Sequence, residues 1–228
     1  DYSGMFAYQE PANYFETITN YADYMEIMNE SARNIDKTPI YSQTMIDIWR
    51  EAERDPYGLA ESGYPNYVAY PNVDWQKALF TPGLYQKHSL SAGGTSKNTK
   101  YLISLDYMDN PGIVEGTGVK KMSYRVNLSS NITQWLEIGA KVYGFRQNRD
   151  INDWANSSGY MNRAVPGIYP YYDGKYGWME NPEQSTDSRN NLYFINRAHG
   201  QSTVHYINTT GFLKITLPLD IKYNASFN

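Results

Sequence analysis

The chain has 228 residues, with 20 Lys and Arg against 24 Asp and Glu, and a formal net charge of −4. This balance provides neither the basic surface that nucleic-acid binding requires nor an acidic tail. Cysteine is absent, which excludes disulfides and thiolate metal sites. No apolar run approaches the roughly 18–20 residues of a membrane-spanning helix, but barrel strands are not excluded, because half of their residues face water.

Tyrosine is the unusual component of the sequence, with 23 Tyr against 7 Phe and 5 Trp. Tyr combines an apolar ring with a polar tip, which suits surfaces that are half wet. Interface girdles of membrane barrels, sugar-binding clefts and an ordinary Tyr-rich all-β surface all fit this composition. Composition alone does not separate the three.

The first 83 residues predict a strand followed by a long excursion. Aromatic and small residues alternate over 1–10 and predict a strand. Helical spacing of apolar residues predicts two amphipathic helices, over 14–34 and 42–54, and residues 58–83 are predicted to be irregular. The candidate N-caps are Thr19 or Asn20 for the first helix and Ser42 or Thr44 for the second.

Residues 84–147 predict four consecutive strands with two unlike faces. Tyr101, Ile103 and Leu105 alternate with polar residues, and the same period of two recurs in each strand. The expected strands are 84–92, 100–108, 122–132 and 135–146, with a turn over 93–98 and a loop around 110–112. Such strands fit either a soluble sandwich with a wet outer face or a membrane barrel with a wet lumen.

Connection lengths favour the barrel. A second long excursion over 148–202 precedes a strand over 203–217, a tight turn and a last strand that still alternates at residue 228, so we expect a piece of a longer polypeptide. Long and short connections alternate, and in an antiparallel meander this places all long loops at one end. Outer-membrane barrels have that asymmetry, whereas sandwiches more often mix loop lengths at both ends.

The distribution of charge adds to this argument. The faces with Tyr101, Val126 and Ile138 are almost free of charge, as lipid contact requires, because a Lys or Arg at mid-bilayer costs about 2–4 kcal/mol. We expect these three side chains to point outward to lipid, whereas burial between two packed sheets would favour the sandwich. The predicted polar faces carry Lys100, Asp106, Arg125, Asn127, Glu137, Lys141, Asp220, Lys222 and Asn224.

Several segments, in order, resemble the SusC/RagA-type TonB-dependent transporters of bacterial outer membranes. The resemblance covers most of the chain and is weakest over 13–68 and 148–165. The segments are PNVDW (71–75), QKHSLSAGG (86–94), KYLISLDY (100–107), GIV (112–114), YRVNL (124–128) and WLEIG (135–139).

The resemblance implies about seven strands of a larger antiparallel transmembrane barrel of roughly 22 strands, from the part that follows the plug. Such transporters import nutrients, typically glycans or peptides, with energy from the TonB complex and with a SusD-like surface lipoprotein as a lid. We expect the plug and the TonB contact to lie outside this chain. The implied divisions of 1–228 are an extracellular loop with two short helices (11–83), four barrel strands (84–147), a second extracellular loop (148–202) and further strands (203–228).

No pattern predicts catalysis or a cofactor. His88, His199 and His205 do not have metal-site spacing. The run from Asp150 to Asp153 begins like a calcium loop but lacks its later Gly and Glu. No nucleophile triad or phosphate-binding loop is present, so we expect a protein that is not an enzyme. The alternative to a transporter is a soluble β-rich carbohydrate-binding or adhesin module.

Aromatic residues of the second excursion are the candidate ligand contacts, because flat rings stack on sugars and on peptides. The same rings could instead pack the loop against its neighbours or against a partner lipoprotein. The candidates are Trp154, Tyr160, Tyr169, Tyr171, Tyr172, Tyr176 and Trp178.

Overall fold

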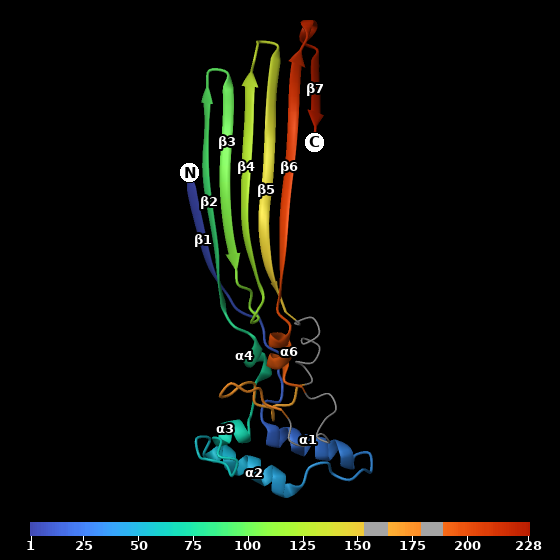
Figure 1. Ribbon diagram of the computed structural model, residues 1–228. Coiled ribbons are helices and arrows are strands. Elements are labelled where there is room, and N and C mark those ends of the chain that lie inside the picture. Colours follow the sequence, from blue (N-terminus) through green and yellow to red (C-terminus); the bar gives the residue numbers. More distant parts are fainter. Residues whose placement is uncertain (153–163, 179–188) are drawn as a thin grey trace.

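The computed structural model describes residues 1–152, 164–178 and 189–228, and in these ranges the chain forms one antiparallel sheet with a helical cap at one end (Figure 1). The seven strands lie in sequence order, each paired with the next along the chain. They are β1 (Tyr2–Gln9), β2 (Gly83–Ser96), β3 (Thr99–Asn110), β4 (Gly118–Asn131), β5 (Leu136–Ile151), β6 (Gly200–Thr216) and β7 (Lys222–Phe227).

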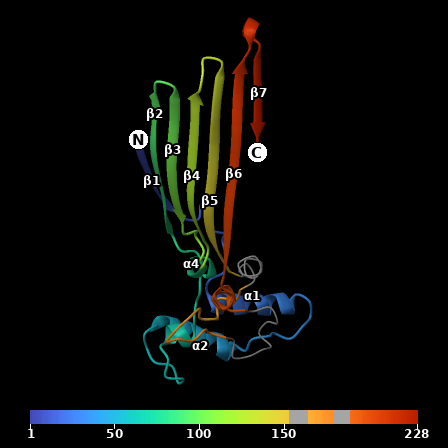
Figure 2. The ribbon, with the colours of Figure 1, turned by 45° about the horizontal axis from the view of Figure 1, so that its top comes forward.

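Short and long connections lie at opposite ends of the sheet, as the sequence predicted. Figures 1 and 2 show the short turns together at one end and the labelled α-helices at the other. The short connections are 97–98, 132–135 and 217–221, the last containing the 3-10 turn η2 (Pro218–Asp220), and the long-loop end carries 10–82, 111–117 and 152–199.

Strand β2 is longer than predicted. The expected turn over 93–98 was wrong, because Gly93 and Gly94 continue the strand to Ser96 and pair with β3. The ring of Tyr101 lies across Gly94, where a Cβ atom would come within 2.8 Å of the tyrosine oxygen. Gly94 therefore makes room for a neighbouring ring in the sheet, a role of strand glycines that resembles a turn signal in sequence.

The strand register keeps the two predicted faces apart. Ile103 pairs with Ala92 on one side and with Val126 on the other, and Val126 pairs with Val142. Tyr101 is 46% and Ile138 is 43% exposed. The described strands form a single sheet, and none of its side chains belongs to the buried hydrophobic cluster. This arrangement contradicts a sandwich within the described residues.

The hydrophobic core lies in the long connections. We call the helices and segments at this end the cap. Its helices are α1 (Tyr21–Arg33), α2 (Gln43–Arg54), α3 (Asn66–Ala69), α4 (Trp75–Leu79) and α6 (Asn191–Arg197). The buried cluster combines residues from both long excursions and from the loop between β3 and β4: Tyr21, Ala22, Met25, Tyr41, Ile46, Trp75, Leu79, Val114, Val165, Ile168 and Ile195.

The two longer helices begin where the sequence predicted caps. The side chains of Asn20 and Ser42 accept hydrogen bonds from the first turns of α1 and α2. The prediction missed α3, α4 and α6, because each is too short for a periodic pattern. None of the helices in the described ranges is long and apolar enough to cross a membrane.

Hydrogen bonds between loops join the cap into one unit. The Trp75 indole donates to the Val165 carbonyl at 2.9 Å, and the Val73 amide donates to the Pro166 carbonyl at 3.0 Å. The Thr81 amide donates to the Ile113 carbonyl at 2.9 Å. Segments far apart in sequence are thereby fixed side by side, which places tyrosines of both excursions around one cleft.

Candidate ligand-binding surface

An aromatic cleft of about 240 Å³ lies in the cap between the two long excursions. One wall comes from the first excursion and the other from the hairpin that the second excursion forms around Tyr172. We call it the aromatic cleft. It is lined by Tyr64, Val68, Ala69, Pro71, Gly167, Tyr169, Tyr172, Lys175, Tyr176, Gly177 and Trp178.

Tyrosine rings connect the two walls. Tyr67 lies 5.8 Å from Tyr169 and 6.1 Å from Tyr172 between ring centroids, and Tyr64 lies 6.1 Å from Tyr172. Most of these ring pairs meet edge to face, the geometry that the aromatic quadrupole favours. Desolvation raises the pKa of Tyr67, and the nearby Tyr172 and Tyr169 raise it further. The hydroxyl is therefore a neutral donor and acceptor at physiological pH.

A tight hairpin sets the positions of two cleft residues. Tyr172 and Lys175 exchange backbone hydrogen bonds of 2.8 and 2.9 Å. The two residues between them, Asp173 and Gly174, both have positive φ angles, 45° and 78°. Consecutive positive φ angles define the mirror-image turn that suits a two-residue hairpin, and Asp-Gly is a favoured sequence for it. The turn chemistry therefore fixes where Tyr172 and Tyr176 enter the cleft.

Asn190 fastens this hairpin to the rest of the cap. Its fully buried amide nitrogen lies 3.1, 2.8 and 2.9 Å from the carbonyl oxygens of Tyr169, Pro170 and Gly177. Its amide oxygen accepts from the Tyr193 backbone and caps α6. One side chain thus satisfies backbone groups of the cleft wall and starts a helix.

The structure brings together four of the seven predicted contact residues. Tyr169, Tyr172, Tyr176 and Trp178 line the cleft. Tyr171 lies outside the lining, with its ring 4.9 Å from that of Tyr176. Trp154 and Tyr160 lie outside the described residues. That these rings contact a ligand stays a prediction.

Sequence reasoning missed the contribution of the first excursion. Tyr64 and Tyr67 lie in the stretch that was predicted only as irregular, and Lys175 is the one cation of the lining. The available signal was the concentration of Tyr and Pro over 58–83. Pattern alone gives no reason to connect it with a hairpin more than a hundred positions later.

The polar face of the sheet carries a large excess of positive charge. Several cations lie over rings of the same face: the Lys121 nitrogen is 4.2 Å from the Phe145 centroid and Arg125 is 5.5 Å from that of Tyr143. By strand register this face holds eight basic residues (Lys87, Lys100, Lys121, Arg125, Lys141, Arg149, Lys214 and Lys222) and two acidic ones (Asp106 and Glu137).

Neither the three histidines nor the calcium-like run forms a metal site within the described residues. The Tyr2 hydroxyl and His88 Nδ1 form a hydrogen bond of 2.7 Å. Asp150 accepts from Gln201, and Asn152 donates to the Glu115 carbonyl, whereas Asp153 lies outside the described residues. Within the described ranges, no three His, Asp or Glu residues lie together as a metal site would require.

Comparison with known proteins shows which proteins the chain resembles in sequence and in fold. No protein-family model matches it. TonB-dependent receptor P3 of Formosa agariphila is 34% identical over 106 residues, which cover 46% of this chain and 10% of the relative. TonB-dependent receptor SusC of Bacteroides thetaiotaomicron is 36% identical over 65 residues, 28% of this chain and 6% of the relative. The RagAB peptide transporter structure matches 99% of this chain and 27% of its own with a TM-score of 0.72 at 20% identity.

The chain is thus similar in sequence to TonB-dependent receptors, SusC among them, and similar in fold to the RagAB transporter. It spans 10% of the length of TonB-dependent receptor P3, 12% of that of TonB-dependent receptor P26 and 27% of the RagAB chain. Receptors of this type lie in the bacterial outer membrane, and the seven strands are part of the wall of the receptor barrel. The apolar face is therefore the lipid side, and the face rich in Lys and Arg is the lumen side, because lipid does not accept that charge.

Proposed function

We propose that the whole receptor imports a nutrient, an oligosaccharide or a peptide, across the outer membrane. This chain supplies part of the barrel wall and a cap that contacts the substrate. A surface lipoprotein is the proposed lid, and the TonB complex the proposed energy source, through parts of the receptor outside this chain. The observation that carries the proposal is the aromatic cleft at the end of a receptor-type sheet where all long connections gather.

The proposal fixes an orientation, with the long-loop end outside the cell and the short turns in the periplasm. In outer-membrane barrels the longer loops are extracellular. Residues 11–83 and 148–202 are then extracellular loops. The chain has no cysteine, which allows a direct test. Cysteine at Leu59 of the cap, which is 75% exposed, should react with a membrane-impermeant maleimide on intact cells.

The matched control is cysteine at Leu219 of the opposite turn, which is 93% exposed. It should react only after the outer membrane is opened. Labelling of Leu219→Cys but not of Leu59→Cys on intact cells would reverse the orientation and remove the proposal.

Substrate contact is tested on the complete receptor with its lipoprotein. Tyr172→Ala and Trp178→Ala should each weaken binding of the imported oligosaccharide or peptide about threefold to tenfold, because one ring contact contributes roughly 0.5–1.5 kcal/mol. Phe15→Ala removes a ring that is 70% exposed and does not line the cleft, and it should leave binding unchanged. Calorimetry with both substrate classes also decides between them. Equal affinity of all three variants for the imported substrate would exclude the cleft as the site.

A further inference from the structure

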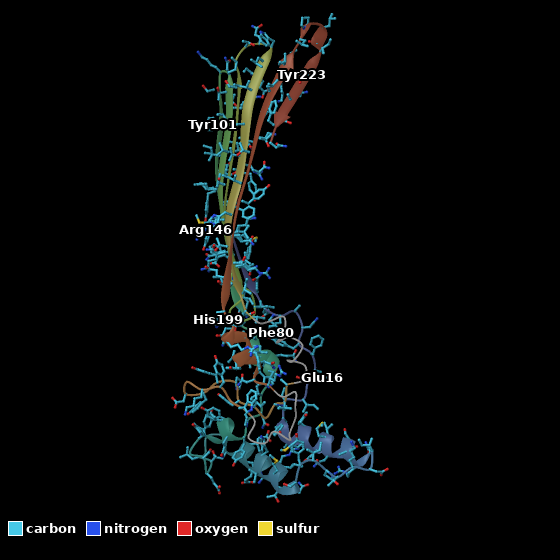
Figure 3. All side chains as sticks on the ribbon, turned by 45° about the vertical axis from the view of Figure 1, so that its right-hand side comes forward. Glu16, Phe80, Tyr101, Arg146, His199 and Tyr223 are labelled. Atoms are coloured by element: carbon cyan, nitrogen blue, oxygen red, sulfur yellow. The ribbon has the colours of Figure 1, made fainter. Side chains whose placement is uncertain are left out.

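Counted from the short turns, one row is the first to break the apolar character of the lipid face. His88, Tyr107, Met122, Arg146 and His205 pair successively across β2 to β6. Between this row and the short turns, the same face of these strands carries no charged residue. Arg146 is exposed, and Figure 3 places it on the same side of the sheet as Tyr101. The row therefore brings a guanidinium to the border of the uncharged surface that extends from it to the short turns.

An apolar groove of about 450 Å³ adjoins this row. Arg146 lies at its edge on β5. At the opposite edge, Tyr2 and His88 are held together by their hydrogen bond. The groove is lined by Tyr2, His88, Ser89, Leu90, Leu105, Asp106, Tyr107, Met122, Ser123, Tyr124 and Arg146.

The position along the strands places the groove in one leaflet. An apolar band about 25 Å tall takes about ten residues of a tilted strand. Counted from the turn at 97–98, ten residues reach Lys87 on β2 and Met108 on β3, which pair with each other. The groove thus occupies the half of the band that is nearer the long loops, and Arg146 lies where headgroups begin.

Arg146 is available to an anion. Within the described residues it forms no ion pair with a carboxylate. Asp109, one row further toward the long loops on the same face, is bound by Lys120 at 3.4 Å. A guanidinium binds phosphate through paired hydrogen bonds, and beside a low-dielectric bilayer such a contact is stronger than in water.

We propose that this groove binds lipid A, the phosphorylated and acylated sugar lipid of the outer leaflet. Acyl chains fill the apolar groove between Leu90 and Tyr124, and Arg146 binds a phosphate. The inference rests on the outward orientation of the long loops under the proposed function. Location argues for this occupant, because a groove on the lipid face meets outer-leaflet lipid at that height, and the charge of Arg146 complements the phosphate.

The experiment compares variants of the complete receptor–lipoprotein complex in nanodiscs. Native mass spectrometry measures retained lipid A against added phosphatidylglycerol. Arg146→Ala should lower lipid A retention roughly tenfold, the effect of losing a charge-assisted hydrogen bond of about 1.4 kcal/mol. Arg146→Lys should keep part of it, and Leu105→Trp, which fills the groove, should lower retention with Arg146 intact. Arg149→Ala removes a cation three positions later on the lumen face and should change nothing.

Three results would overturn the inference. Equal retention by Arg146→Ala and wild type removes the site, and equal binding of lipid A without its phosphates removes the role of the charge. If the wild-type receptor forms a dimer and Arg146→Ala dissociates it, the occupant of the groove is a second copy of the receptor. Uptake by the wild type is measured in parallel. If the receptor takes up its substrate but does not bind lipid A, the proposed function stands and the lipid A site is removed. If the cysteine labelling at Leu59 and Leu219 shows the opposite orientation, both proposals are removed.

Discussion

The sheet and the cap are held together by opposite means. Every buried apolar side chain of the described residues lies in the cap or its connecting loops, with Met25, Leu79 and Ile195 completely inaccessible. In the sheet, both faces are open, and large apolar side chains such as Leu105 are 53% exposed. Hydrogen bonds in register join the strands, but no protein core covers them in the described ranges.

The sheet and the cap therefore depend on different surroundings for their stability. The wall depends on its surroundings, because lipid covers one face and the contents of the lumen cover the other. The cap depends on its own packing, in the manner of a small soluble domain. Changes in the aromatic cleft should therefore leave the wall undisturbed, whereas changes on the lipid face should act on insertion and leave the cleft intact.

The largest expected effect is on the core of the cap. Met25→Ala leaves a cavity at a site with no exposure and should destabilise the cap by about 2–5 kcal/mol. Hydrogen exchange in α1 and α2 should accelerate, while strand amides keep their protection. Ile27→Ala on the same helix, at a site that is 44% exposed, is the matched control. Loss of strand protection in Met25→Ala would show that the wall needs the cap.

A charge on the lipid face should destabilise the barrel wall. Ile103→Lys places a charge near the centre of the apolar band and should cost about 2–4 kcal/mol of barrel stability. The folded fraction in outer membranes, measured by gel mobility without heating, should fall. Leu102→Lys puts the same charge on the lumen face next in sequence and should be tolerated. Equal losses in both variants would contradict the assignment of the two faces.

A smaller effect is expected at the fastening of the cleft. Asn190→Ala removes the amide that serves three carbonyls and the cap of α6, which should cost about 1–3 kcal/mol locally. Proteolysis near Gly177 should increase, and substrate binding should weaken. Asn190→Ser keeps a capping oxygen but not the carbonyl contacts, so it separates the two roles. A cleft unaffected by both substitutions would mean that the hairpin is held by other contacts.

The smallest expected effect is that of alkaline pH, which should destabilise the cap before the sheet. Burial, and secondarily Tyr41, raises the pKa of Tyr21 in the cap above that of an unfolded tyrosine. The folded cap therefore holds this proton more tightly. Its stabilising contribution is complete below about pH 10 and declines above it by roughly 1.4 kcal/mol per pH unit. Hydrogen exchange of α1 relative to the strands, from pH 9 to 11, should show the cap loosening first, and Tyr21→Phe should reduce the slope.

Local patterns predicted the wall well. Period-two alternation is a property of each strand by itself, and connection lengths follow directly from the spacing of strands. The caps of α1 and α2 were also readable, because Asn20 and Ser42 act on backbone amides within their own first turns. The prediction erred at Gly93 and Gly94, which pair with β3, and at Gly94 the ring of Tyr101 on that strand occupies the space of a side chain.

The sequence by itself determined that apolar and polar residues alternate along the strands, which face of the sheet avoids charge and which end carries the long loops. These features follow from the order of residues within each strand and from the lengths of the connections between strands. Only the tertiary structure decided that Tyr64 and Tyr172 share one cleft and that Asn190 fastens its wall. It also decided that Arg146 adjoins a groove reaching back to Tyr2. Those contacts join residues separated by long stretches of chain, and their geometry is fixed by packing between loops and by strand register, for which no local pattern exists.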